Sequence, residues 1–412
     1  MAQTRLTPLR QSTRYVLKGL AITVLLLLIK APFEQTQGYA WLEQRIYSGL
    51  SSVLPAFREK GQSVIVIDIS HLPSGTYDGN GKLEVTSRAE LRKLLQVLAE
   101  IRPQAVAIDI DFSPNQAGWQ NDQDPSFFDF CLSLSPRLPL VLGVYRTQRE
   151  PPETWLGAAQ YAHLAASMLL DEDNLQRVPV WLHAPGVAQP LPGLAVALAQ
   201  ARYGPRSSPM DKLAPWVYKF SERRIDSTNP QGLQVEEVLV NYSAIGQLIS
   251  ETIRISNAQE LRRHAAQIEN RLVLLGAVDQ ATDTFAVPVL KRPQPGVFVH
   301  ASAVFTLASE PVYALSHGAA IGLDLLISLA VLLAVVKARR GRVDAAPRAR
   351  EAAEARTLQC AVVLVLCAGV AVVYYARVFW FDFLLVVLFL LLHPGVEKRL
   401  HAWLASRHGD TP

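Results

Sequence analysis

Four strongly apolar stretches divide this chain and constrain its fold more than any other feature of the sequence. A helix needs about 20 mostly apolar residues to cross the core of a bilayer, and each stretch approaches that length. Lys18 lies near one end of the first stretch, where a lysine side chain can reach the membrane interface. The sequence therefore predicts four transmembrane helices, one before and three after a large polar region. Their expected bounds are 15–33, 314–336, 358–375 and 378–393.

Basic residues beside these stretches predict their orientation. Three arginines precede the first stretch, and seven lysines and arginines against three acidic residues lie between the second and the third. The positive-inside rule then makes 1–14, 337–357 and 394–412 cytoplasmic, and 34–313 one external domain. The net charge of +4 is explained by this topology. It therefore gives no support to nucleic-acid binding.

The first stretch is expected to stay in the chain as a signal anchor. Gly38–Ala40 is a weak cleavage motif that lies beyond the apolar core, and the stretch is long for a cleaved signal. Residues 39–57 follow with a helical apolar stripe. This juxtamembrane helix either packs on its own domain or pairs with a second copy of the chain, so a homodimer is one candidate assembly.

Short apolar runs alternate with helical patterns inside the external region. Runs this uniformly apolar are typical of strands covered on both faces, and their alternation with helices is typical of a parallel sheet. We therefore expect an α/β domain with three layers and a mostly parallel sheet. Residues 296–308 are expected to begin extended and to turn into a short helix before the second span. The expected strands are 63–69, 105–112, 139–145, 236–242 and 271–277, and the expected helices include 87–101 and 257–270.

Carboxylates follow several of these strands and are the first candidate ligand-binding residues. Asp68, Asp109 and Asp111 end two strands that we take as neighbours, at the sheet edge where α/β proteins bind ligands. Asp283 follows the last strand and can join them. Such a cluster suits Mg²⁺, Ca²⁺, or a cationic or polyhydroxylated ligand, so the metal and cofactor content stays open. The alternative is that these aspartates cap helices and loop amides.

Two further ionisable residues stand in apolar surroundings. His300 lies in the run PGVFVHASAV and can approach the loop of Asp283. A single histidine is a weak indication of zinc, so it is either a ligand-binding residue or a structural histidine that bonds a carbonyl or an aspartate. Asp324 lies near the centre of the second span, where a carboxylate is costly. It is the candidate for coupling across the membrane, unless it is protonated and bonds a backbone carbonyl.

Motifs of hydrolytic or phosphoryl-transfer chemistry do not accompany these residues. The sequence contains no G-x-S-x-G, H-E-x-x-H or P-loop pattern. We therefore assign no catalytic residue and expect that the protein is not an enzyme.

The order of the motifs along the chain resembles one family. VIVIDIS, AVAIDIDF, NDQDPSF, DEDNLQRVPV, LVNYSA, LLGAVDQATD and PGVFVHASAV occur in that order, within a layout of one span before and three after the domain. Together they resemble the CHASE2 sensory domain, over about residues 15–395. The matching positions that are not named above are Arg88, Asp122, Asp124, Arg177, Pro179, Asn241, Gly276, Pro288 and Gly296.

This resemblance implies a sensor in the bacterial inner membrane, with a periplasmic domain that binds an unidentified ligand. Members of the family usually carry a kinase or a nucleotide cyclase after the last span, whereas only residues 394–412 follow it here. The signal is therefore expected to pass to a separate effector or membrane partner. Two alternatives are a structural or scaffold subunit of an envelope complex and a periplasmic carboxylate-dependent hydrolase.

Overall fold

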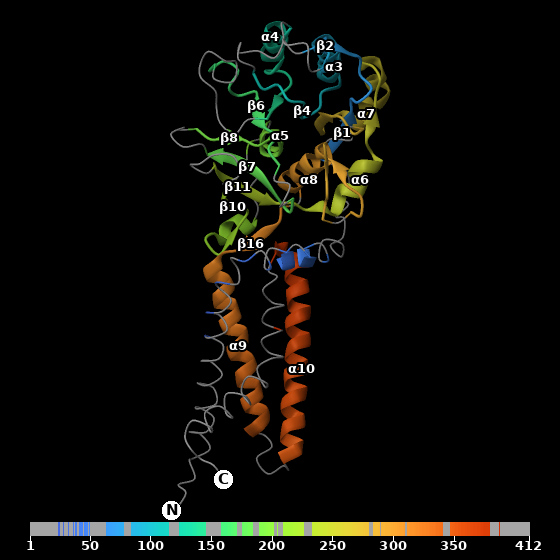
Figure 1. The fold of residues 1–412 in the computed structure, drawn as a ribbon. Coiled ribbons are helices and arrows are strands. Elements are labelled where there is room, and N and C mark those ends of the chain that lie inside the picture. Colours follow the sequence, from blue (N-terminus) through green and yellow to red (C-terminus); the bar gives the residue numbers. More distant parts are fainter. Residues whose placement is uncertain are drawn as a thin grey trace, which may run out of the picture. The chain divides into compact units, whose positions relative to one another are not determined.

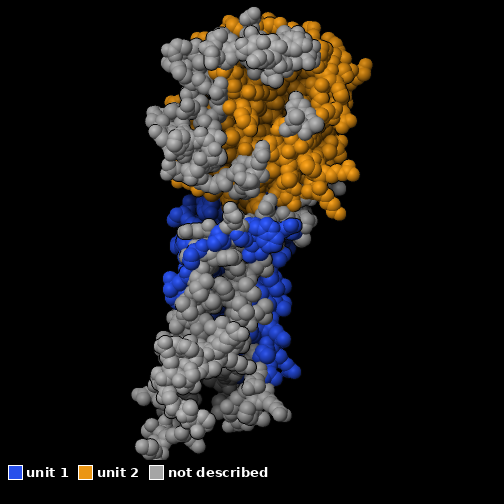
Figure 2. All heavy atoms as spheres, viewed as in Figure 1, with its two compact units in different colours: residues 1–50, 213–218, 314–412 blue, residues 51–212, 219–313 orange. Residues whose placement is uncertain are grey.

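The structure is a computed structural model, and its described residues fall into two compact units (Figure 2). The helical unit comprises Met1–Leu50, Leu213–Tyr218 and Ala314–Pro412, and the sheet unit comprises Ser51–Lys212 and Lys219–Tyr313. The described residues are 24, 28, 32, 36, 38, 41–43, 45–47, 49, 63–77, 84–114, 123–145, 158–170, 175–183, 189–201, 204, 209–225, 233–279, 283–288, 290–309, 311–340, 347–379 and 387.

Six parallel strands form the centre of the sheet unit, in the spatial order β12-β1-β13-β4-β5-β6 (Figure 1). β13 is the last of the six along the chain, yet it lies between β1 and β4. Four of the five predicted strands belong to this sheet, so the prediction of a mostly parallel sheet is confirmed. The bounds are Val64–Asp68 for β1, Ala105–Asp109 for β4, Leu140–Val144 for β5, Ala165–Ser167 for β6, Ile253–Arg254 for β12 and Leu272–Gly276 for β13.

Helices cover both faces of this sheet, which confirms the predicted three layers. One face carries α3, with α4 and η3 beside it, and the other carries α8, with α5 and α6 beside it (Figure 1). The segment predicted as a helix over 257–270 is η3 followed by α7. The bounds are Arg88–Ile101 for α3, Asp124–Leu134 for α4, Leu194–Gln200 for α5, Ile245–Ser250 for α6, Ala258–His264 for η3, Ala265–Ile268 for α7 and Gly296–Ala308 for α8.

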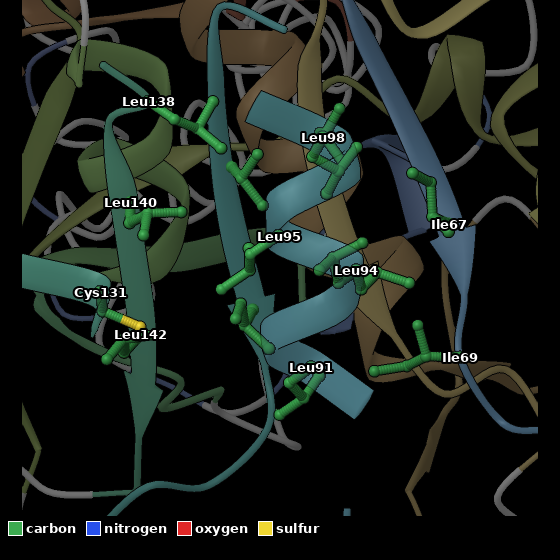
Figure 3. Packing of buried hydrophobic residues seen from close by; sticks show 14 of the residues in the cluster. Ile67, Ile69, Leu91, Leu94, Leu95, Leu98, Cys131, Leu138, Leu140 and Leu142 are labelled. Atoms are coloured by element: carbon green, nitrogen blue, oxygen red, sulfur yellow. The ribbon is translucent and has the colours of Figure 1, made fainter. Parts of the chain in front are cut away.

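The local sequence explains why α3 forms and where it packs. The side chain of Ser87 accepts a hydrogen bond from the backbone N–H of Glu90, and Arg102 ends the helix in a left-handed conformation. The leucines of one helix face are fully buried and lie over strands of the sheet (Figure 3). Burial of each such leucine contributes about 1.5–3 kcal/mol relative to exposure. These leucines are Leu91, Leu94, Leu95 and Leu98.

The prediction that residues 236–242 belong to the parallel sheet is wrong. This segment is part of β11 (Leu233–Leu239), which pairs antiparallel with β10 (Phe220–Ile225) and β7 (Arg177–His183). β8 (Leu191–Pro192) completes this second sheet of four strands. The run EEVLVNY begins with two glutamates, and the charged side chain of Glu236 bonds His183 at 2.9 Å. A strand of the fully covered parallel sheet would leave no place for such a charge.

The prediction that residues 296–308 begin extended is also wrong, because α8 is helical from Gly296 onward. Pro295 precedes the first helical residue, and all 13 residues of α8 are buried. An apolar helix that is buried all round shows no amphipathic stripe, so its sequence is hard to distinguish from that of a buried strand.

The helical unit contains two long helices that pack side by side, α9 (His317–Arg340) and α10 (Pro347–Ala371) (Figure 1). Among the described residues, His317–Ala338 and Ala355–Ala376 are long and apolar enough to cross a membrane. They coincide with the predicted spans 314–336 and 358–375. The predicted span 15–33 lies almost wholly outside the described residues.

The residues after α10 include the first two of the fourth predicted span, 378–393. A π-helical turn, Val372–Ala376, follows α10, and Arg377 then adopts a left-handed conformation with φ of 53°. Val378–Phe379 forms a short strand, β17. The predicted span is therefore not helical at its first two residues, and the rest of it, except residue 387, lies outside the described residues.

A small sheet joins three separate parts of the helical unit in the order β17-β16-β9. β16 (Tyr313–Leu315) directly precedes α9, and its residues Ala314 and Leu315 pair antiparallel with β9 (Val217–Tyr218). Ser316 then caps α9, because its side chain accepts a hydrogen bond from the N–H of Ala319 at 3.3 Å.

Candidate functional site

Asp68, Gly276 and Asp109 form one row at the carboxyl ends of three neighbouring strands. Asp68 is the register partner of Gly276, and Gly276 is the partner of Asp109. Residues in register on adjacent strands point to the same face, and here that face is the one under α8. The prediction that the strands of Asp68 and Asp109 are neighbours is wrong, because β13 is inserted between them. The two aspartates are therefore separated by two strand spacings, about 10 Å.

The glycine in the middle of this row allows α8 to approach the sheet closely. A Cβ atom at position 276 would lie 2.6 Å from Cγ2 of Val297 in the first turn of α8 and 3.3 Å from Cβ of Asp109. Any side chain at this position would push the helix away from the strands. Gly276 thus sets the distance between α8 and the row of carboxylates.

Asp109, Asp283 and His300 come together around the first turns of α8, and we call them the α8 cluster. Nε2 of His300 lies 4.0 Å from Oδ1 of Asp109, and the two side chains are 3% and 10% exposed. The carboxylate of Asp283 lies over Gly296, where an added Cβ would be 3.0 Å from its Oδ2. His300 follows Gly296 by one helical turn, so Asp283 and His300 share one face of α8.

The loop that carries Asp283 is held on the start of α8 by its backbone. β14 (Thr284–Phe285) pairs antiparallel with β15 (Gln294–Pro295), and the N–H of Gly296 donates to the carbonyl of Asp283 at 3.1 Å. A carboxylate at a helix N-terminus is stabilised by the helix dipole. Asp283 itself is exposed, so the α8 cluster runs from a solvent-accessible carboxylate to a buried imidazole.

Burial shifts the pKa values within the α8 cluster. Loss of hydration and, to a smaller extent, the nearby charge of Asp283 together raise the pKa of Asp109 to about 7. Partial loss of hydration on the side of its carboxyl group that faces the protein raises the pKa of Asp283, while the backbone N–H of Gly296 opposes this shift. Burial lowers the pKa of His300 to about 4, opposed by a hydrogen bond with the backbone of Met168. Perturbed carboxylates and histidines of this kind concentrate at functional sites.

Asp68 holds a loop. Its Oδ1 accepts hydrogen bonds from the N–H of Ser70 at 2.9 Å and from the hydroxyl of Ser70 at 2.6 Å. Its Oδ2 lies 3.8 Å from Nε of Arg254. The Ser70 hydroxyl accepts in turn from the N–H of Val278, which follows β13. These contacts fit the loop-capping alternative stated above for the aspartates, while a role of Asp68 in ligand binding stays a prediction.

Asp111 ties two strand ends together. Its Oδ1 accepts hydrogen bonds from the N–H of Ser113 at 2.8 Å and from the N–H of Tyr145 at 2.9 Å. Tyr145 follows β5, so this carboxylate connects the loop after β4 to the end of its neighbour. Its place in the ligand site also stays a prediction.

A buried ion pair that the sequence did not reveal supports the opposite face of the sheet. Nε of Arg88 donates to Oδ1 of Asp124 at 2.7 Å, and both side chains are at most 2% exposed. The guanidinium also lies 4.4 Å from the ring centroid of Phe112. The sequence contains a signal for the burial of Arg88 alone, because Arg88 precedes Leu91 by one turn and so shares the buried face of α3. The pair joins the start of α3 to the start of α4.

Asp324, the candidate for coupling across the membrane, is buried in α9 at 2% exposure. It is thus enclosed by protein in the helical unit. Within the described part of the chain, no group of three or more histidine, cysteine, aspartate or glutamate side chains is arranged to hold a metal ion.

Comparison with known proteins identifies a family for the sheet unit and for most of the first long helix of the helical unit. The CHASE2 domain matches residues 20–336, which include the sheet unit, the α8 cluster and most of α9. Searches of curated proteins and of solved structures found no match. Because the match covers more than half of the chain, the protein belongs to the CHASE2 family, a family of extracytoplasmic sensory domains.

Proposed function

We propose that this protein is a membrane-anchored sensor that binds its signal at the α8 cluster and relays it to a separate effector. One observation carries this proposal: the exposed Asp283 lies next to the buried Asp109 and His300, and all three are grouped around the first turns of α8. A ligand that reached Asp283 would act directly on the position of α8. The chain continues from α8 through β16 into α9, so a movement of α8 has a short covalent route to the candidate span.

The chemistry of the cluster favours a small polar ligand that carries a positive charge or several hydroxyl groups. The exposed carboxylate of Asp283 attracts a cation, and the carboxyl oxygens of Asp109 can accept hydrogen bonds from the ligand. Nδ1 of His300 is buried and has no hydrogen-bond partner within 3.5 Å among the described residues, so it can receive a bond from a ligand. Sensing of this kind requires no catalytic residue, and we assign none.

For the topology we propose four spans, with both termini and residues 337–357 in the cytoplasm of a bacterial cell. Residues 34–313 would then be the periplasmic domain, held by the inner membrane through 15–33, 314–336, 358–375 and 378–393. The positive-inside rule supports this orientation, and α9 and α10 support two of the spans.

A thermal-shift screen of the full chain in lipid nanodiscs tests the binding site. The probes are polyamines, amino acids, sugars, Mg²⁺ and Ca²⁺. We expect at least one class to raise the melting temperature of the wild type but not that of Asp109→Asn or Asp283→Asn. Asp279→Asn is the matched control, because it removes an exposed carboxylate that pairs with His71 outside the α8 cluster, and it should keep the shift. If a hit stabilises all four proteins equally, the α8 cluster is not its site.

The relay needs its own test. We propose that Asp324 couples α9 to its neighbours, so Asp324→Asn should leave the ligand-induced thermal shift intact and abolish the response of the effector. The effector is sought by crosslinking in intact membranes, where we expect a kinase, a cyclase or another membrane protein. If no such partner crosslinks with or without a ligand, signalling through a separate effector is refuted, while ligand binding at the α8 cluster is judged by the screen alone.

A further inference from the structure

We propose that the loop Leu213–Trp216 is a lipid-binding element that lies in the head-group region of the bilayer, beside the start of α9. This inference rests on the proposed membrane location of α9 and α10. It adds a site of contact with phospholipid at a part of the chain far in sequence from any predicted span.

The backbone fixes this loop next to the first residue of α9. Leu213–Tyr218 belongs to the helical unit, although the residues on both sides of it in sequence belong to the sheet unit. β9 pairs with β16, and the N–H of Ser316 donates to the carbonyl of Trp216 at 2.8 Å. Because Ser316 is the cap of α9, Trp216 is held at the level where the candidate span begins.

The side chains of the loop are turned outward. Trp216 is 64% exposed and Leu213 is 47% exposed, whereas the next residue, Val217, is buried. The N–H of Trp216 donates to the carbonyl of Leu213 at 2.8 Å, which closes a tight turn with both large side chains at its surface. Exposed tryptophan and leucine are unfavourable in water. A tryptophan is favoured at a membrane interface, where its ring is in an apolar medium and its N–H can find a partner.

Other exposed aromatic residues mark the same end of the two helices. Tyr375 is 82% exposed and lies in the π-helical turn after α10, three residues before β17. β17 shares the small sheet with β16 and β9, so the end of α10, the start of α9 and the loop are tied to one another. Tyr47 packs edge-on against Phe379 of β17 at 5.2 Å between ring centroids. Trp41, six residues before Tyr47 in the sequence, is 58% exposed.

The surface of α9 and α10 beyond this aromatic end argues for lipid as the occupant. Large apolar side chains are exposed along both helices, as expected where they face hydrocarbon. The succession of an aromatic end and an apolar shaft matches the interface and the core of a bilayer. A protein partner on the loop alone would leave these exposed apolar side chains of α9 and α10 unexplained. The exposed apolar residues of the shaft are Leu326, Leu333, Val363, Leu364 and Val370.

The test uses tryptophan fluorescence of the full chain in phosphatidylcholine vesicles, with and without bromine on the acyl chains close to the head groups. The emission of Trp216 is obtained as the difference between the wild type and Trp216→Phe. We expect this difference emission to be blue-shifted and reduced at least twofold by the brominated lipid. Trp181→Phe is the matched control, because Trp181 lies in β7 of the sheet unit and its difference emission should not change.

Three outcomes would overturn the inference, and each has a distinct meaning. Red-shifted emission that is quenched by aqueous iodide and not by brominated lipid would place Trp216 in water. Blue-shifted emission that resists both quenchers would mean that a second copy of the chain or another protein surface covers the loop. If the protein does not float with the vesicles in a density gradient, the membrane location itself fails. A protein that floats while Trp216 stays unquenched refutes only the loop assignment.

Discussion

Nε2 of His300 and Oδ1 of Asp109 lie 4.0 Å apart in a site where burial favours the neutral form of both groups. The pKa of Asp109 is about 7 and that of His300 is about 4. Between these values the aspartate keeps its proton while the histidine has none. A carboxylic acid thus faces a neutral imidazole, and any added charge, from a ligand or from a change of pH, acts on a site with little hydration to screen it.

The pH dependence of stability provides the first prediction. Between about pH 4 and 6.5 the folded protein binds a proton on Asp109 that the unfolded chain has lost, so this group lowers stability as pH rises. The unfolded chain binds a proton on His300 that the folded protein lacks, so this group raises stability as pH rises. The two effects largely cancel in the wild type.

Single substitutions remove this cancellation. Relative to the wild type, His300→Gln should lose stability as pH rises from about 4 to 6.5, and Asp109→Asn should gain stability from about pH 4 to 7. Each slope should approach about 1.4 kcal/mol per pH unit. Urea unfolding of the full chain across this range measures the differences. Ser302→Ala is the control, because it changes a buried side chain of α8 that does not titrate, so its effect should not vary with pH. If the difference in free energy of unfolding from the wild type does not change with pH for either variant, the pKa values of Asp109 and His300 are not shifted as stated.

Removal of the charge of Asp283 should lower the pKa of Asp109. The negative charge of Asp283 is one cause of the raised value, although burial is the larger. In the wild type, the stability gained by Asp109→Asn should stop increasing near pH 7, the pKa of Asp109. When the same substitution is made in Asp283→Asn, this gain should stop increasing at a lower pH that is still above the ordinary pKa of an aspartate. Asp279→Asn, which removes an exposed carboxylate near His71, should leave it unchanged. If the gain stops increasing at the same pH with and without Asp283, the two carboxylates do not interact.

Gly276→Ala should destabilise the sheet unit by about 1–3 kcal/mol, because the new methyl group would overlap Val297. Gly246→Ala is a matched control in α6, since a Cβ there meets nothing within 4 Å. This control should be neutral or stabilising by up to about 1 kcal/mol, because alanine favours helix. Denaturant unfolding of the two variants compares them directly. Equal effects would mean that α8 can move away from the sheet without loss.

The buried pair of Arg88 and Asp124 should be costly to break from either side. Arg88→Met leaves a buried carboxylate without its guanidinium, and Asp124→Leu leaves a buried guanidinium without its carboxylate. Each should cost about 3–5 kcal/mol. The double variant should cost less than the sum of the two, as a double-mutant cycle in urea would show. Additive losses would mean that the two side chains do not depend on each other.

The sequence predicted the layers of the domain better than the order of its strands. Uniformly apolar runs identified β1, β4, β5 and β13, because strands covered on both faces carry no polar positions. β6 and β12 were missed, since Ala165–Ser167 and Ile253–Arg254 are too short to form a pattern. The position of β13 in the sheet depends on crossover connections that periodicity does not encode.

The candidate site was predicted in part, and for a related reason. The short segment between Asp283 and His300 indicated that these two could meet, and the structure brings both to the start of α8. Asp68 was grouped with Asp109 because strand order was unknown. The pair of Arg88 and Asp124 was not predicted, because residues in separate helices meet only through the packing of both on the sheet.

The insertion of β13 between β1 and β4 has a consequence for how the domain is made. Until residues 272–276 have emerged during synthesis, β1 and β4 have no partner for the edges they present to each other, and the first half of the chain cannot close its own sheet. Folding must wait for a contact between segments far apart in sequence, which makes it slow. Before β13 is available, Asp68 and Asp109 lie on two strands that are not joined in one sheet. A nascent chain released before Leu272 would therefore be a substrate for chaperones and proteases, with no half-functional form of the domain.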